Sequence, residues 1–447
     1  MKKTAILLVA LLLSSPGETF SQIPLNLKLR HRIEGDTITL TSVIRSRGFL
    51  TVQTATDSTT GKSDNILYTD LRYYEIIPGS IESLWQMKIL ESGVYENLLK
   101  SGYSYETRYA MEEMMKEYLG KAEQNNAFYI DSYLEARLYA LLRMVYPVRH
   151  PDRRPGVLSL RILSDITPDA WVGPEGTLII TTGMITALNS ETELMALMAQ
   201  EVAHFALDHH LTSYTNTLSS GIDPALGNII RYTIQQELAA DRCAVAVLEA
   251  YGKSSAALGS MLSNVLASGK LMGNYYLETS RGSFPDASKR AASNPGMAPY
   301  KSAEYDKLIA PVISYNAFSA YNQSQFLLCR WLLNRNIASG MASPDDLVLL
   351  SQAMMNLSGS AEEDEKALEV IHSVIADLQE PSPGAFKQEA LLLLRLGRRG
   401  EAETALDRCD EALDREEQKY RSMTGDWSQI LSYLASEKEW VDRTRSR

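Results

Sequence analysis

Hydrophobic residues along the chain follow two different periods, which divide it into a β-rich beginning and a long helical remainder. Residues 37–41 and 49–53 alternate apolar and polar side chains, a pattern typical of half-buried strands. From about residue 81 onward, apolar side chains recur at helical spacing, most clearly through residues 111–118 and 134–142. The pattern predicts an α+β fold that is mainly helical.

The middle of the chain predicts a small sheet followed by well-marked helices. Apolar runs at residues 157–163 and 178–182 predict two strands, with a Gly/Pro turn before the second. Ser190 and Glu193 have the spacing of a capping box at the start of an amphipathic helix. A further long helix is expected over about residues 231–251.

The C-terminal part predicts pairs of antiparallel helices. Residues 342–435 alternate small and large apolar side chains, and residues 390–402 resemble the turn region of a tetratricopeptide-type repeat. Two degenerate repeat units and a plain helical cap both fit, and such a short array is expected to pack on the central domain. The expected regions are a signal peptide at 1–21, a β-rich N-terminal region at 22–100, a central domain at 101–300 and a helical C-terminal region at 301–447.

The first residues are typical of an export signal. Lys2 and Lys3 precede an apolar run at residues 5–13, which is too short for a membrane-spanning helix. Cleavage near Gln22 would give a soluble periplasmic or secreted protein, with an uncleaved anchor as the alternative. The formal net charge of −11 argues against nucleic acid or an anionic membrane as the main partner. The few, widely spaced cysteines form neither a disulfide framework nor a zinc–cysteine motif.

The sequence Gln200-Glu201-Val202-Ala203-His204 is the clearest candidate for chemistry. In a helical zinc peptidase, histidines at positions i and i+4 hold the metal, and the glutamate after the first deprotonates the attacking water. Glu201 and His204 are present here, whereas Gln200 occupies the first ligand position. Glu-x-x-His alone arises by chance in roughly every second chain of this length, so it needs support from elsewhere.

Glu237 and Asp241, on the next long helix, provide that support. A glutamate from a separate helix is the third donor that such a site requires, and an aspartate one turn later could orient a ligand imidazole. Alanine and valine residues surround both acids, which favours an interior position over a solvated acidic face.

From about Leu134 to Arg290 the chain resembles the zinc metallopeptidase family that includes HtpX, the CAAX prenyl protease and BepA. The likeness rests on several motifs in the family's order, at residues 169–171, 176–185, 189–194, 237–241 and 283–290. The resemblance implies that the central domain is a zincin-like metallopeptidase domain with zinc as its cofactor. The trailing helices also resemble the architecture of BepA.

The same resemblance implies roles for particular residues. His204 and Glu237 would bind zinc, Gln200 would stand at the degenerate ligand position, and Glu201 would be the general base. An edge strand would hold an extended peptide by strand addition. That substrate strand is expected to comprise Leu178, Ile179, Ile180 and Thr181.

Two positions depart from the family's pattern. Gln200 replaces a ligand histidine, and Phe284 replaces the histidine of a Thr-His-Pro loop. An amide oxygen is a weaker zinc ligand than an imidazole, so metal affinity and water activation should both fall. On a continuous helix His209 would lie about 140° round from His204, too far to replace the missing ligand, whereas Asp208 would share the face of His204. The resemblance, in which a histidine near this position is common, implies a structural or ligand-orienting role for His209.

Three functions are therefore in competition. The favoured one is a catalytically impaired peptidase relative that binds extended peptide or unfolded envelope protein, with a further protein partner on the C-terminal helices. The alternatives are an active zinc endopeptidase of envelope proteins that tolerates Gln200, and a structural scaffold that uses the C-terminal helices alone. Two acids and a histidine retained near the core argue against the scaffold, since unpaired buried charges are costly.

Overall fold

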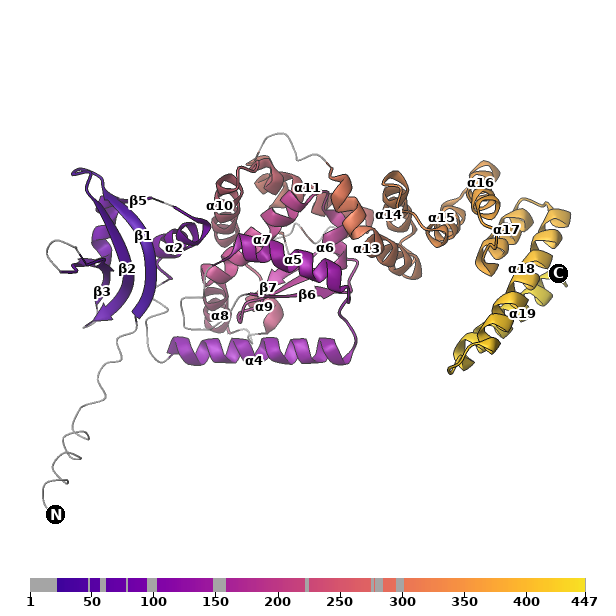
Figure 1. Cartoon of the computed structure of the whole chain (residues 1–447), viewed down its shortest axis with the longest axis horizontal. Helices are drawn as coiled ribbons and strands as arrows, with labels where there is room; N and C mark the ends of the chain where they lie inside the picture. The colour runs from indigo at the N-terminus through magenta and orange to yellow at the C-terminus, as the bar shows by residue number, and fades with distance from the viewer. Residues whose placement is uncertain are drawn as a thin grey trace, which may run out of the picture.

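The computed structural model shows an elongated molecule with a curled sheet at one end, a mixed centre and a helical tail (Figure 1). It is α+β and mainly helical, as predicted from the sequence. The signal-peptide prediction for residues 1–21 lies outside the described residues. The structure describes residues 22–46, 49–56, 62–77, 79–94, 103–147, 158–221, 225–274, 277, 284–294 and 301–446.

The N-terminal sheet has the strand order β4-β3-β2-β1-β5, and all neighbouring strands are antiparallel. Its elements are β1 (Gln22–His31), β2 (Thr37–Ser46), β3 (Phe49–Thr54), β4 (Asn65–Leu67), the 3₁₀-helix η1 (Tyr68–Tyr73) and β5 (Tyr74–Ile77). Leu27 and Leu29 lie two residues apart on one face of β1, and they are fully buried together with Leu40 and Val43 of β2, where the pairing with β3 is irregular between Leu40 and Ser42. The strands predicted from the period-2 pattern are confirmed.

Helix α2 (Ile81–Ser92) joins this sheet to the centre of the molecule, since it packs on β1 and on a central helix. Its Trp85 is fully buried, and the indole Nε1–H donates to the carbonyl oxygen of Val145 at 2.7 Å. The Tyr146 ring meets the Trp85 ring edge-on. The N-terminal sheet therefore shares one hydrophobic core with the central domain.

Replacing Trp85 by phenylalanine should lower the free energy of unfolding by about 1–3 kcal/mol, because the buried Val145 carbonyl loses its donor. Urea unfolding of the full chain measures this. The matched control is Tyr133→Phe at a side chain that is 75% exposed, where the change should stay within about 0.5 kcal/mol. Equal stability of the two variants would contradict the prediction.

The central sheet corrects one prediction from the sequence. Its strands are β6 (Ser159–Leu163), β7 (Ala170–Val172) and β8 (Thr177–Thr181), in the order β6-β8-β7. Strand β8 runs parallel to β6 and antiparallel to β7, and all of its residues are buried. The prediction that residues 178–181 form an edge strand is therefore wrong, since an unbroken apolar run suits a strand covered on both faces.

The two edges of this sheet have different neighbours. Beyond β6, residues 127–129 extend the sheet, with Phe128 bridging to Leu163 and the Tyr129 N–H donating to the Ile162 carbonyl. Strand β7 is the opposite edge, and it lies next to the helices that carry the candidate site.

The central helices surround this sheet. They are α4 (Tyr103–Gln124), α5 (Ser132–Val145), α6 (Thr182–Ala187), α7 (Glu191–Ala206), α8 (His209–Ser219), α9 (Leu226–Ile229), α10 (Ile234–Ala250), α11 (Ala256–Leu271) and α12 (Ala287–Ala292). Helix α7 is buried on almost every side, packed between α5, α10, α11 and β7.

Only half of the predicted capping box forms at the start of α7. Ser190 Oγ accepts the Glu193 N–H, but the Glu193 carboxylate accepts the Asn189 N–H and bonds to Ser260 and Asn264 of α11. The buried carboxylate therefore fixes α7 against α11 as well as starting the helix.

The C-terminal helices form a row in which each packs on the next, as the predicted helix pairs require. They are α13 (Ala303–Asn322), α14 (Phe326–Ala338), α15 (Pro344–Leu357), α16 (Ala361–Asp377), α17 (Pro383–Arg395), α18 (Arg399–Ser422) and α19 (Ser428–Arg445). Buried Arg335 joins the row to the centre by pairing with Asp306 and donating to the carbonyls of Thr186 and Leu188. Within the described residues, none of the helices has the length and apolar character needed to span a bilayer.

Candidate active site

Helices α7 and α10 lie against each other and bring the three predicted ligand positions together. Spacing of four residues places Gln200 and His204 on one face of α7, and Glu237 faces them from α10. Gln200 Nε2 donates to Glu237 Oε2 at 3.0 Å, and His204 Nε2 lies 3.8 Å from the same oxygen. All three side chains, and that of Glu201, are buried.

Arg290 is a central member of the site, although the sequence assigned it no role. Its side chain is 1% exposed, and its Nη1 lies 2.9 Å from Glu237 Oε2. Its Nε and Nη2 donate to the two oxygens of Asp241 at 2.8 and 2.7 Å. The prediction that Asp241 orients a ligand imidazole is therefore wrong, because the carboxylate is taken by the guanidinium. The only sequence signal for Arg290 was its place in the loop that resembles the peptidase family.

His209 contacts His204 because the chain turns sharply after α7. The helix ends at Ala206, and Asp208 has a left-handed backbone with φ of 57°. This turn brings His209 Nδ1 to 3.0 Å from His204 Nδ1. Asp208 pairs with Arg108 of α4, so the prediction that it shares the face of His204 is wrong. That error arose from treating α7 as one continuous helix past Ala206, whereas the predicted structural or ligand-orienting role of His209 is compatible with its contact to His204.

Tyr232, which the sequence did not single out, lies against His204. The two rings are stacked, with centroids 3.7 Å apart and an interplanar angle of 17°. The Tyr232 hydroxyl is 2.9 Å from His210 Nε2, which is also 2.8 Å from the carbonyl oxygen of Val172. Since a carbonyl only accepts, His210 carries its proton on Nε2. These contacts link the edge strand β7 to the imidazole of His204.

Burial controls the charges of the site. It raises the pKa of Glu201 well above its ordinary value, and the nearby Glu237 carboxylate adds to this. Burial also raises the pKa of Glu237 to about 7, although Arg290 opposes the shift. Burial lowers the pKa of His204 well below its ordinary value and that of His209 to about 3, so both imidazoles are neutral at pH 7.

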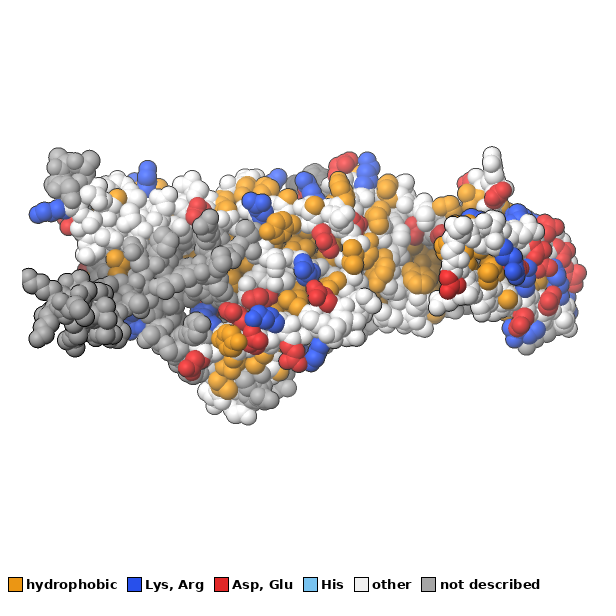
Figure 2. All heavy atoms as spheres, turned by 60° about the horizontal axis from the view of Figure 1, so that its bottom comes forward, with side chains coloured by type: hydrophobic (Ala, Val, Ile, Leu, Met, Phe, Trp, Pro, Cys, Tyr) orange, Lys and Arg blue, Asp and Glu red, His pale blue; other side chains and the backbone are white. Residues whose placement is uncertain are grey.

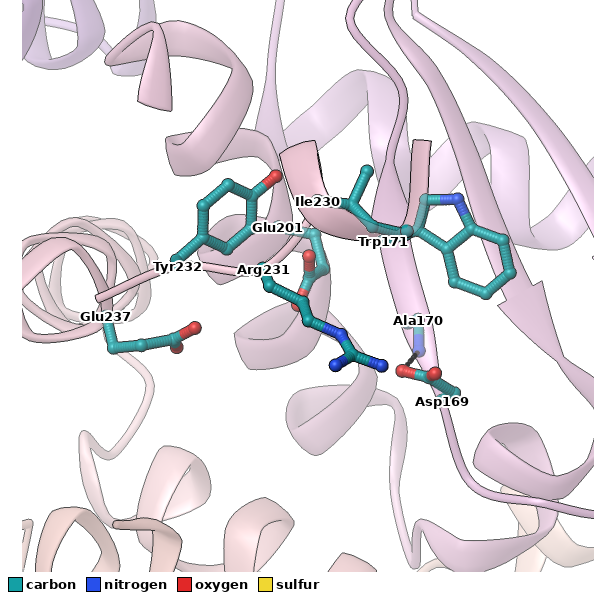
Figure 3. A pocket seen from close by; sticks show the side chains of 9 residues that line it. Asp169, Ala170, Trp171, Glu201, Ile230, Arg231, Tyr232 and Glu237 are labelled. Atoms are coloured by element: carbon teal, nitrogen blue, oxygen red, sulfur yellow. Dashed lines mark hydrogen bonds between the residues drawn. The ribbon is translucent and has the colours of Figure 1, made fainter. Parts of the chain in front are cut away.

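A small polar cavity opens between β7 and the start of α10 (Figure 3). Its volume is about 110 Å³, room for only a few water molecules. The carboxyl groups of Glu201 and Glu237 border the cavity, and Arg231 points toward Asp169 on its other side (Figure 3). The cavity is also lined by Ala170, Trp171, Gly227, Ile230 and Tyr232.

The donor atoms present do not fit a resident zinc ion. A catalytic zinc site takes three good protein donors, and among the residues that the structure describes only His204 and Glu237 qualify. Gln200 directs an N–H toward Glu237, and its own Oε1 is buried with no partner among the described residues. Within the same residues, no group of three His, Cys, Asp or Glu side chains is arranged to hold a metal.

Comparison with known families places this geometry in context. Residues 154–222 match the model of peptidase family M48. The chain is thus metallopeptidase-like. The matched segment runs from β6 to α8 and contains Gln200, Glu201 and His204, whereas Glu237 and Arg290 lie beyond it. Members of this family are in general zinc-dependent peptidases. No curated protein matches the chain.

Proposed function

We propose that this protein is an exported, catalytically impaired relative of the M48 peptidases that binds extended peptide or unfolded envelope protein. The observation that carries the proposal is the hydrogen bond from Gln200 Nε2 to Glu237 Oε2. The Gln200 amide occupies the carboxylate oxygen that a zinc ion would need. It also stands where the family has an imidazole, which is a stronger zinc ligand than an amide. Hydrolysis should therefore be slow or absent while the fold around the site is retained.

We propose strand β7, an edge of the central sheet, as the peptide-binding strand in place of β8. The Asp169 carbonyl and the Gly173 N–H bond to β8, so the alternation of an antiparallel ladder turns Ala170 and Val172 outward. The Ala170 N–H donates to the Asp169 side chain, and the Val172 carbonyl contacts His210. The Ala170 carbonyl and the Val172 N–H are then the groups through which an added strand would pair.

The α13–α14 pair is the second surface suited to a protein partner. Hydrophobic side chains gather over the middle of the molecule in the region of these helices (Figure 2). Tyr315 and Phe318 of α13 and Leu327 and Trp331 of α14 are all exposed. Exposed aromatic and aliphatic groups of this kind favour protein contacts, in keeping with a partner on the C-terminal helices.

Replacing Val172 by proline tests peptide binding at β7, because it removes the outward N–H without touching the ladder to β8. The affinity for a fluorescent, permanently unfolded casein should fall about 10-fold, as expected for loss of roughly one well-made hydrogen bond. Fluorescence anisotropy measures this. The matched control is Val172→Ala, which also shortens the side chain but keeps the N–H and should bind within about twofold of wild type.

The same experiment separates the three functions when cleavage is followed by gel. Binding without cleavage supports the proposal. Casein cleavage by the wild type that stops on adding a chelator would establish an active zinc endopeptidase instead. If the protein neither binds nor cleaves casein, but residues 301–447 still bind a protein partner, the result would favour the structural scaffold.

A further inference from the structure

We infer that Gln200 takes the place of a metal ion, joining α7 to α10 so that the site keeps its shape without zinc. A zinc ion would bridge donors on these two helices and hold them together. Here the Gln200 amide makes that connection directly, donating from α7 to the Glu237 carboxylate of α10 at 3.0 Å. The inference goes beyond peptide binding, and it would stand if the protein bound no peptide.

The orientation of the Gln200 amide follows from its neighbour. Glu237 Oε2 faces the Arg290 Nη1 donor at 2.9 Å and is therefore an acceptor, so the amide must present Nε2 to it, because Oε1 in that place would bring two acceptors together. The consequence is visible on the other side of the amide, where Oε1 is buried without a partner among the described residues. An unpaired buried acceptor is unfavourable, so the bond to Glu237 has to outweigh it for this rotamer to be held.

Positive charge at the site comes from the protein itself. Arg290 contacts Glu237 Oε2 at 2.9 Å and makes a two-pronged pair with Asp241. A metal dication would otherwise be the group that offsets these acids in a buried site. Arg290 belongs to α12 and Gln200 to α7, so side chains from two helices meet the Glu237 carboxylate of α10.

His204 is likewise held by protein groups. Its Nδ1 contacts His209 Nδ1 at 3.0 Å, and one of its ring faces is covered by Tyr232. The side chains at the three positions where the family's zinc ligands would stand are therefore each fixed by a protein partner. These positions are Gln200, His204 and Glu237. This is the arrangement expected of a site whose structure does not depend on a metal.

Thermal unfolding of the full-length wild-type chain, with and without EDTA or 1,10-phenanthroline, tests the inference. The wild-type Tm should change by less than about 1 °C on chelation, because nothing that binds only the folded state is removed. Gln200→Ala should lower the Tm by about 2–6 °C through loss of a hydrogen bond to a charged group. The matched control is Gln235→Ala at an exposed position of α10, which should leave the Tm unchanged.

The variant Gln200→His should show the opposite metal response. Its Tm should rise when zinc is added and return when the chelator follows, since three good donors then face one point. A wild-type Tm that drops by several degrees on chelation and recovers with zinc would overturn the inference, even if Gln200→Ala proved too unstable to purify. So would a Gln200→Ala variant as stable as Gln235→Ala.

Discussion

Replacing Arg290 by alanine should lower the free energy of unfolding by about 3–5 kcal/mol, the largest effect expected of any single substitution at the site. The guanidinium is buried between Glu237 and Asp241, and its removal leaves two acids without their cation. Burial alone would lower the pKa of Arg290, but the Asp241 and Glu237 carboxylates raise it above its ordinary value. The ion pair is thus favourable in place, and breaking it is costly because the remaining charges stay buried.

Urea unfolding followed by circular dichroism measures this change. Lys289→Ala provides the matched control, because that neighbouring side chain is 81% exposed and should contribute within about 0.5 kcal/mol. Arg290→Lys should fall between the two, since one ammonium cannot make the two-pronged contact with Asp241. An Arg290→Ala variant within about 1 kcal/mol of wild type would show that Glu237 and Asp241 find other partners.

Introducing histidine at position 200 should convert the protein into a zinc-dependent peptidase. Gln200→His places two imidazoles at i and i+4 on α7 opposite Glu237, and it removes the amide that occupies Glu237 Oε2. Glu201 already borders the cavity beside these positions. Cleavage of fluorescent casein should rise by at least about 100-fold over wild type, because a bound zinc ion would activate the water that Glu201 deprotonates.

Two controls decide what such a gain means. Gln200→His combined with Glu201→Gln should bind zinc near one ion per chain but lose the gain in cleavage, whereas Gln200→Asn should behave as wild type in cleavage. Wild-type cleavage as fast as that of Gln200→His, and equally sensitive to chelator, would contradict the proposal that Gln200 impairs catalysis.

Local sequence patterns predicted the secondary structure well where an element depends only on the residues within it. The alternation at residues 37–41, the capping residue Ser190 and the helix pairs after residue 342 all correspond to elements of the structure. The spacing of Gln200 and His204 also anticipated their common face, because helical geometry depends only on neighbouring residues.

Two of the errors at the site share one cause. Residues 178–181 read as an edge strand, yet β8 lies between β6 and β7. Asp241 was expected to contact an imidazole but pairs with Arg290, which lies 49 residues further along the chain. Such pairings depend on which distant segments meet, and no local period encodes that choice.

By itself, the sequence determined the helical and strand content and the metallopeptidase-like character of the chain, and it predicted that Gln200 stands at the first ligand position. Only the tertiary structure decided that β7 rather than β8 is at an edge of the central sheet, that Arg290 joins Glu237 and Asp241, and that the Gln200 amide bonds to Glu237. The physical reason is one of range. Periodicity and capping act over a few residues, whereas the site is made by contacts between α7, α10 and α12, which fold together from separate parts of the chain.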